Sequence, residues 1–271
     1  MRREWLVVGA IWAALTALGE FVVTNWSMLP DGYSREAEVV NEAYVLLLVL
    51  AVPVFTFMVT MLGYSIVAFR STGAADDGPN LRSNKRVVWT WLAVTAALDL
   101  AVLINPGFVG LRDIRGTQSA DMAIQVVGQR WNWTVTYDNG ATSTTEMVVP
   151  VDTRIRFDVT STDVLHSFWV PGFGLKVDAV PGRTTQMYVT TERTGDNADD
   201  SRLRVQCAEL CGLSHADMAM TVRVVEQAEY DAWVENLKNN PPAGAQQAAA
   251  AAPTADGGQS DQQASASDQE G

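Results

Sequence analysis

A twelve-residue segment from Cys207 to Met218 concentrates the side chains that could do chemistry. It reads Cys-Ala-Glu-Leu-Cys-Gly-Leu-Ser-His-Ala-Asp-Met, so two cysteines, a histidine and a methionine follow one another at spacings of four, four and three residues. The chain has two cysteines and two histidines in all, and the other histidine, His166, lies upstream. Every Cys and His therefore belongs to one candidate constellation, in which thiolate, thioether and imidazole donors favour copper over hard cations.

Two thiolates can bridge two metal ions, each of which is then completed by one histidine, with a methionine and a backbone carbonyl as weak outer ligands. A disulfide between Cys207 and Cys211 is an alternative outside the cell, but it leaves the two histidines and Met218 without a role. A zinc site of two cysteines and two histidines is another alternative, but zinc has no use for Met218. The β-rich runs on either side predict that the segment is a loop.

Short β-rich runs dominate the chain from about residue 105 to residue 240. The runs are Ile124–Val127, Trp131–Tyr137, Arg154–Val159, Thr185–Thr190, Leu203–Gln206 and Met220–Val225. In the second run apolar and polar residues alternate, so every second side chain from Trp131 to Tyr137 is predicted to share one face of a strand. Short strands at this spacing are typical of a sandwich or a barrel, and a helix over residues 226–239 is predicted to close the domain.

Three apolar runs precede the β-rich domain. They cover Trp5–Val23, Ala43–Phe69 and Val87–Ile104, and a helix needs roughly 20 residues to cross the hydrocarbon core of a bilayer. The first run also resembles a signal peptide, because it follows Met1-Arg2-Arg3. No Ala-x-Ala-like cleavage site follows it, so we expect three transmembrane helices, or two if the first is cleaved.

Basic residues set the orientation of these helices. Residues 70–86 contain four basic side chains, whereas residues 24–42 contain one, Arg35, among several acids. The positive-inside rule therefore places residues 70–86 and the N-terminus in the cytoplasm and everything after about residue 105 outside. This predicts a multi-pass protein of the cell membrane. Glu20 and Asp99 lie inside apolar runs, but so near the outer interface that solvation explains them better than function does.

The overall composition excludes several classes of function. The chain of 271 residues has 19 basic and 31 acidic side chains, a net charge of −12, so nucleic acid is not an expected partner. Two cysteines are too few for a disulfide-rich scaffold, and no Cys-x-x-Cys-His sequence is present to attach a c-type haem. The last residues are rich in Ala, Gln, Ser, Gly and Asp, which predicts disorder.

These features divide the chain into four parts. Residues 1–29 are a first transmembrane helix or signal-like segment, and residues 30–104 are a transmembrane helical hairpin. Residues 105–240 are the β-rich domain that carries the candidate metal ligands, and residues 241–271 are a disordered tail.

The segment from Cys207 to Met218 resembles the binuclear copper (CuA) signature Cys-x-Glu-x-Cys-Gly-x-x-His-x-x-Met of subunit II of cytochrome c oxidases. Residues 128–133, 160–168 and 176–183 also resemble that family, and the similarity covers about residues 40–225 in the right order. The resemblance implies a membrane-anchored all-β protein, in which the transmembrane helices are followed by a cupredoxin-like β-barrel.

The resemblance assigns a role to each candidate residue. The copper ligands would be His166, Cys207, Glu209, Cys211, His215 and Met218. The cysteines would bridge two coppers, each histidine would bind one, the methionine would be a weak axial ligand, and the glutamate would bind through its backbone carbonyl. The side chain of Glu209 would also reach a magnesium ion shared with subunit I. Trp131 matches the family's exposed aromatic residue through which electrons enter, and the alternative is a tryptophan in the core.

The resemblance further implies that the chain is an electron relay in a respiratory oxidase. Electrons from a soluble donor would pass through the copper centre to haem in subunit I, where dioxygen is reduced to water and protons are translocated. The chain would then be a subunit of an oxidoreductase without holding the oxygen-reducing site. Its partners would be subunit I, subunit III and the soluble donor, either cytochrome c or a blue-copper protein.

Two alternative functions stay open. One is a quinol-oxidase subunit II of the same fold, a branch that lacks the copper ligands found here, and the other is a stand-alone membrane-anchored copper electron carrier. One position departs from the family pattern, because Arg86 stands where a glutamate is associated with proton uptake into subunit I. We hypothesise that protons take another route or use a different carboxylate.

Overall fold

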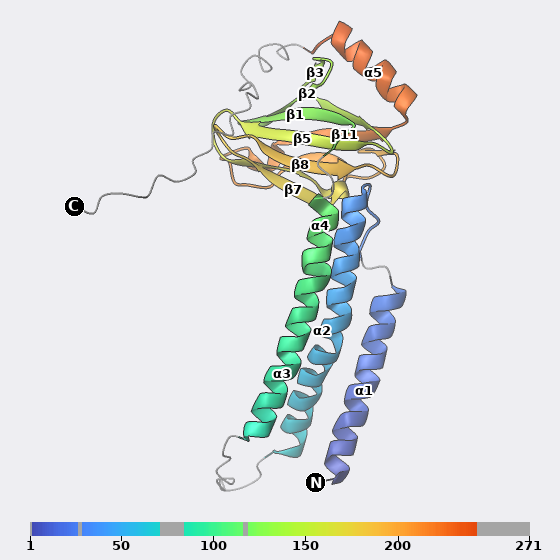
Figure 1. Ribbon diagram of the computed structural model, residues 1–271, viewed down its shortest axis with the longest axis vertical. Helices are drawn as coiled ribbons and strands as arrows, with labels where there is room; N and C mark the ends of the chain where they lie inside the picture. The colour runs from blue at the N-terminus through green and yellow to red at the C-terminus, as the bar shows by residue number, and fades with distance from the viewer. Residues whose placement is uncertain (1, 27–28, 71–83, 116–118, 243–271) are drawn as a thin grey trace, which may run out of the picture.

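The computed structural model describes residues 2–26, 29–70, 84–115 and 119–242. Long helices form one end of the molecule and a β domain forms the other, as Figure 1 shows. Of the tail that the sequence predicts to be disordered, residues 243–271 lie outside the described residues. The domain that carries the candidate ligands therefore stands at one end of a helical stalk.

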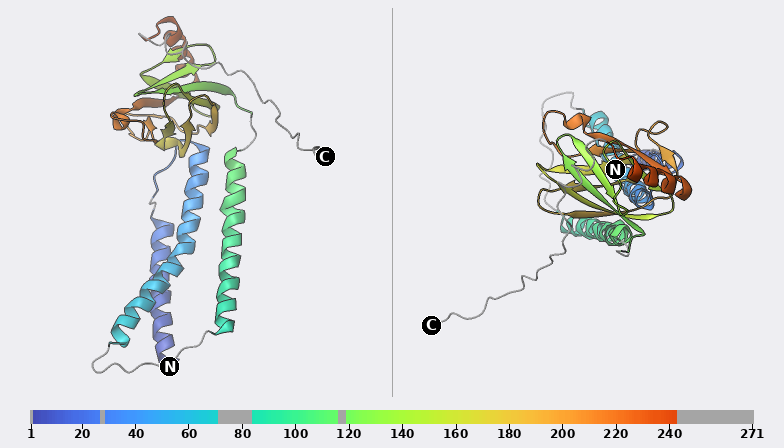
Figure 2. Two further views of the ribbon diagram at one scale, coloured as in Figure 1. Left: turned by 90° about the vertical axis from the view of Figure 1, so that its left-hand side faces the viewer. Right: turned by 90° about the horizontal axis from the view of Figure 1, so that it is seen from above.

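Three helices match the three apolar runs. They are α1 (Arg2–Asn25), α2 (Arg35–Ala68) and α3 (Lys85–Val102), and all are long and apolar enough to cross a membrane. Figure 2 shows them from two further directions. Helix α1 packs on α2, where Trp12 Nε1 donates to the carbonyl of Pro53 (2.8 Å) and the hydroxyls of Thr16 and Thr56 are 2.7 Å apart.

Helical structure continues beyond Ile104, the predicted end of the third run. A π-helical turn (η1, Leu103–Phe108) leads into α4 (Val109–Arg115). Pro106 has no amide proton and Asn105 departs from helical geometry (φ −137°), which explains why the sequence pattern indicates a stop at this point. The boundary predicted at residue 105 therefore falls within a helical segment.

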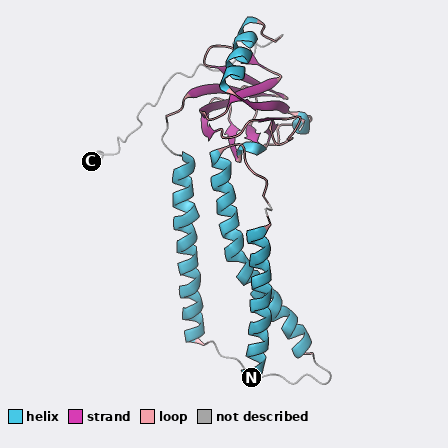
Figure 3. Ribbon diagram, turned by 90° about the vertical axis from the view of Figure 1, so that its right-hand side faces the viewer, coloured by secondary structure: helices cyan, strands magenta, loops and turns pink. Residues whose placement is uncertain are grey.

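The β domain consists of two packed sheets, drawn as magenta arrows above the helices in Figure 3. The first has the order β3-β2-β1-β5-β8 and the second the order β4-β11-β10-β6-β7, with β9 paired to β11. The first sheet contains β1 (Met122–Gln129), β2 (Asn132–Tyr137), β3 (Thr142–Ser143), β5 (Arg154–Ser161) and β8 (Thr185–Thr190). The second contains β4 (Glu146–Pro150), β6 (His166–Val170), β7 (Leu175–Ala179), β9 (Gly195–Asp196), β10 (Arg204–Cys207) and β11 (Ala219–Val225). Within the described residues neither sheet closes on itself, so the expected cupredoxin-like β domain is present as an open sandwich rather than a closed barrel.

The core lies between the two sheets and includes the inward-facing side chains of β2. Trp133, Val135 and Tyr137 are buried there, as the alternation predicts. Trp131 does not share their face, because β2 begins at Asn132 and Trp131 belongs to the preceding turn, where 39% of its surface is exposed. The prediction of a single face therefore fails at its first residue.

Five strands are not predicted from the sequence, namely β3, β4, β6, β7 and β9. Strands β4 and β6 are buried along almost their whole length, so no alternation marks them. A short 3-10 turn, η2 (Pro171–Phe173), connects β6 to β7. The helix predicted over residues 226–239 is present as α5 (Gln227–Asn239), which packs Tyr230, Val234 and Leu237 against the domain.

Candidate metal centre

Two neighbouring strands bring two of the candidate ligands, His166 and Cys207, close together. His166 is the first residue of β6 and Cys207 is the last residue of β10, and the two strands pair antiparallel with Cys207 opposite Phe168. The chain then forms a loop, a 3-10 turn (η3, His215–Asp217) and β11. The amide of Cys207 donates to the carbonyl of Met218 (3.1 Å), which closes this loop at its base. The segment is thus a loop between strands, as its flanking pattern predicts.

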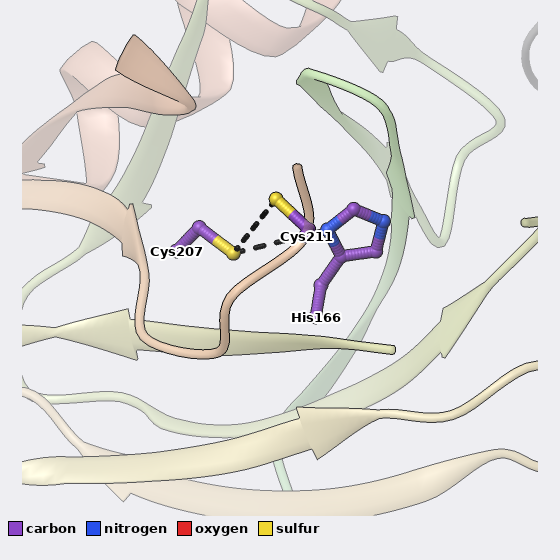
Figure 4. A group of neighbouring side chains, drawn as sticks. All are labelled: His166, Cys207 and Cys211. Atoms are coloured by element: carbon purple, nitrogen blue, oxygen red, sulfur yellow. Dashed lines mark hydrogen bonds between the residues drawn. The ribbon is translucent and has the colours of Figure 1, made fainter. Parts of the chain in front are cut away.

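The two cysteines face each other without being bonded. Their Sγ atoms are 3.8 Å apart, whereas a disulfide requires about 2.05 Å, and both are free and buried. His166 Nδ1 lies 3.8 Å from Cys207 Sγ, and one ligand atom from each of these three residues falls within 4.8 Å of the others. Figure 4 shows the three side chains turned toward one another. The disulfide alternative does not match this arrangement.

The other candidate donors complete the group around the two sulfurs. His215 Nδ1 lies 3.5 Å and Met218 Sδ 3.7 Å from Cys211 Sγ, while the carbonyl oxygen of Glu209 lies 3.2 Å from Cys207 Sγ. Each sulfur thus has its own imidazole on one side and a weaker donor nearby. Met218 has no exposed surface, and a thioether turned toward a thiol favours copper over zinc. The donor set therefore fits a soft, thiolate-bridged metal pair.

A carboxylate behind His166 fixes the orientation of its ring. Asp163 Oδ1 lies 2.9 Å from His166 Nε2, so we place the proton on Nε2 and the free lone pair on Nδ1, which faces the sulfurs. Arg130 donates to the same carboxylate through its backbone N–H (2.9 Å) and its Nε (3.0 Å). Burial alone would raise the pKa of Asp163, but these hydrogen bonds hold it well below its usual range.

Burial also acts on the second sulfur. It raises the pKa of the Cys211 thiol to about 11, and the hydrogen bond with Cys207 adds to the effect. Without a cation this thiol keeps its proton at neutral pH, so a bound metal ion has to displace that proton to obtain a thiolate ligand.

Trp131 lies at the surface against the ligand loop rather than in the core. Gly212, at φ +121°, lies beside its ring, and a Cβ there would be in van der Waals contact with it, 3.5 Å from Trp131 Nε1. The core position belongs to Trp133, which is fully buried and lies edge-on to the rings of His166 and Phe168 (centroids 6.0 and 5.8 Å apart). Exposure and contact with the loop therefore distinguish the two tryptophans.

Some features of the site were not anticipated from the sequence. Asp163 and Arg130 were not singled out, although an Asp three residues before a candidate ligand histidine was a usable signal. The loop also carries two strongly exposed apolar side chains, Leu210 and Leu213. Glu209 is partly exposed, and its role at a magnesium ion stays a prediction.

Comparison with known proteins relates the chain to one family. The family model described as cytochrome C oxidase subunit II, periplasmic domain, matches residues 141–225. Cytochrome c oxidase subunit 2 of Brettanomyces custersianus is 34% identical over 176 residues, which cover 55% of this chain and 68% of that protein. The protein of the same name from Alkalihalophilus pseudofirmus is 36% identical over 155 residues, which cover 56% of this chain and 44% of that protein.

Among solved structures, the periplasmic domain of subunit II of cytochrome oxidase from Bradyrhizobium japonicum has 35% sequence identity. It covers 46% of this chain and 98% of its own, with a TM-score of 0.41. The matched region spans 44% to 68% of the length of the two curated relatives above.

Fold and site define a membrane-anchored, cupredoxin-like protein with a cluster of thiol and imidazole groups that could hold a metal. The chain belongs to the cytochrome c oxidase subunit II family. Its apolar helices anchor it in a membrane, and its β domain corresponds to the family's periplasmic domain on the outer face.

Proposed function

We propose that this chain is the electron-accepting subunit of a respiratory cytochrome c oxidase in the cell membrane. When bound, a CuA pair supplies a one-electron centre between a soluble donor and haem in subunit I, where dioxygen is reduced to water and protons are translocated. The observation that carries the proposal is the pair of free thiols, 3.8 Å apart, each beside its own histidine.

The protein residues have separate tasks at this centre. Cys207, Cys211, His166 and His215 would hold the copper pair through their thiolates and imidazoles. Met218 and the backbone carbonyl of Glu209 would be the weaker donors, because the first lies beside the sulfur of Cys211 and the second beside that of Cys207. The Glu209 side chain is then available for a magnesium ion shared with subunit I.

Rigidity of the ligands is what an electron relay requires of the protein. His166 and Cys207 lie on paired strands, and the Cys207–Met218 backbone hydrogen bond closes the loop between them and β11. Fixed ligands change little in position between oxidation states, so little reorganisation opposes the transfer. Trp131, exposed against Gly212, gives electrons a route from the surface to the ligand loop.

The partners follow from the same assignment. Subunit I holds the haems and subunit III completes the complex. The donor is a soluble protein, and the net charge of −12 favours a basic cytochrome c through electrostatic steering. A blue-copper protein is the alternative donor where high salt screens this attraction.

Copper content and electron paramagnetic resonance of the purified membrane complex test the proposal. We expect two coppers in this chain and a delocalised mixed-valence signal, which Cys211→Ser abolishes and Ser214→Ala, in the same loop, leaves unchanged. A mononuclear signal would indicate a simple copper carrier, and a chain without copper would indicate a quinol-oxidase-type subunit.

A further inference from the structure

The first turn of α2 is built into the β domain instead of only leading to it. Glu36 lies in this turn with only 2% of its surface exposed. Its carboxylate accepts hydrogen bonds from the backbone N–H of Thr190 (2.7 Å) and from Arg154 Nη1 (3.3 Å). Ser34, the N-cap of the helix, donates to the carbonyl of Phe173 (2.9 Å). The helix end is therefore tied to β8, β5 and η2 at once.

Tyr33, the residue before the N-cap, is hydrogen-bonded to three connections of the domain. Its N–H donates to Gly172 O (2.8 Å), its carbonyl accepts from Glu192 N (3.0 Å), and its hydroxyl donates to Asp200 (3.0 Å). The guanidinium of Arg193 lies over its ring, 4.2 Å from the centroid, within cation–π range.

The fit around this segment leaves no spare room. A Cβ at Gly195 would lie 2.6 Å from the Tyr33 ring, and one at Gly174, which has φ +71°, would lie 2.7 Å from Ala37 Cα. Both glycines belong to the domain, and their missing side chains admit residues 33–37. The contact between helix and domain is thus close-packed as well as hydrogen-bonded.

The same loops continue into the two strands that carry ligands. Gly172 lies in η2, directly after β6, which begins with His166. Gly172 N donates to Arg202 O (3.0 Å), just before β10, which ends with Cys207. Residues 33–37 therefore reach one end of β6 and β10, and the ligands lie at the other end of these strands, which are only five and four residues long.

We propose that Glu36 and Tyr33 are positioning residues for electron transfer out of the metal centre. They fix the ligand-bearing strands relative to the membrane helices, and so fix the distance from the centre to the haem-bearing partner subunit. The inference rests on the proposed function, because it needs an acceptor in that partner.

The test measures two electron-transfer steps in the intact membrane complex. Time-resolved absorption after rapid reduction follows the step from donor to copper and the step from copper to haem. Glu36→Ala removes the buried carboxylate, and Glu36→Gln keeps an acceptor for Thr190 N. Glu38→Ala, an exposed carboxylate in the same helical turn, is the matched control.

We expect Glu36→Ala to slow the second step severalfold, because the rate of electron transfer falls steeply as the distance between donor and acceptor grows. The copper signal and the first step should stay unchanged, Glu36→Gln should recover most of the rate, and Glu38→Ala should match the unaltered complex.

Other results overturn the inference. Equal second-step rates in Glu36→Ala and the unaltered complex would show that the partner interface alone sets the distance. Loss of copper from Glu36→Ala, with full function in Glu36→Gln, would show that the segment holds the ligand strands together rather than placing them. Absence of a two-copper signal in the unaltered complex would instead contradict the proposed function.

Discussion

At the scale of single residues, Asp163 is the clearest example of a group that acts through a ligand. Its carboxylate holds the proton of His166 on Nε2 and places a negative charge beside that ring. Asp163→Asn removes the charge but keeps an oxygen acceptor, so the more positive oxidised centre loses stabilisation. We expect the reduction potential to rise by tens of millivolts, where about 59 mV corresponds to a tenfold change for one electron.

Spectroelectrochemical titration of the complex measures this shift. Asp178→Asn is the control, because Asp178 is an exposed carboxylate on the neighbouring strand β7. An unchanged or lower potential in Asp163→Asn, with copper retained, would contradict the role assigned to Asp163.

The two tryptophans near the centre give a second contrast between residues. Trp131→Ala should cost only about 1 kcal/mol of stability, because the side chain lies at the surface, yet it should strongly slow turnover with the soluble donor. Trp133→Ala empties a fully buried site and should cost about 3–5 kcal/mol. Thermal unfolding and donor oxidation rates measure both effects. Normal donor oxidation by Trp131→Ala would exclude this residue from the electron path.

Residue types and spacing could predict the candidate ligands but not the groups that support them. The segment from Cys207 to Met218 contains most of the candidate donors. His166 joins them because it is the other histidine of the chain. The contacts of Glu36 with Thr190 and of Tyr33 with Asp200 join residues more than 150 positions apart. Such contacts depend on how the sheets and the helix meet, and no local pattern contains that information.

At the scale of elements, the apolar runs were predictable because length and hydropathy alone define a span. The strands were predictable where one face is polar, as in β2, and were missed where both faces are buried, as in β4 and β6. The third apolar run ends at Ile104, but the helical segment does not, because η1 and α4 continue it past Asn105 and Pro106.

The packing of α1 on α2 belongs to this scale and can be tested with two glycines. A Cβ at Gly19 would lie 2.7 Å from Val52 Cγ1, whereas a Cβ at Gly9 meets nothing within 4 Å. Gly19→Leu should therefore destabilise the full chain in detergent by about 1–3 kcal/mol through overpacking, and Gly9→Leu should not. Thermal denaturation measures the difference. Equal stability of the two variants would mean that α1 does not pack here in the mature protein.

At the scale of the whole molecule, charge and anchoring act together. The helices hold the β domain at the membrane surface, and under the proposed function the acidic chain would raise the local concentration of a basic donor around it. The domain would then collect electrons from solution while residues 33–37 keep strands β6 and β10 fixed to α2.

The proton supply of the proposed complex is the last whole-molecule question, and Arg86 is the position that decides it. Arg86 occupies the first turn of α3, where its N–H is capped by Asn84 Oδ1 (3.0 Å) and its side chain is exposed. A cation here repels protons on their way to subunit I, so a complex that used this site for proton uptake would be impaired. Our hypothesis is that protons enter by another route, which the side chain at position 86 does not affect. We therefore expect Arg86→Glu to change turnover and proton uptake by no more than about twofold, which is about 0.4 kcal/mol in the barrier. Lys85→Glu, with the same charge change one residue earlier, controls for surface charge. A large gain in Arg86→Glu alone would show that this side chain blocks the family's route and that no other route replaces it.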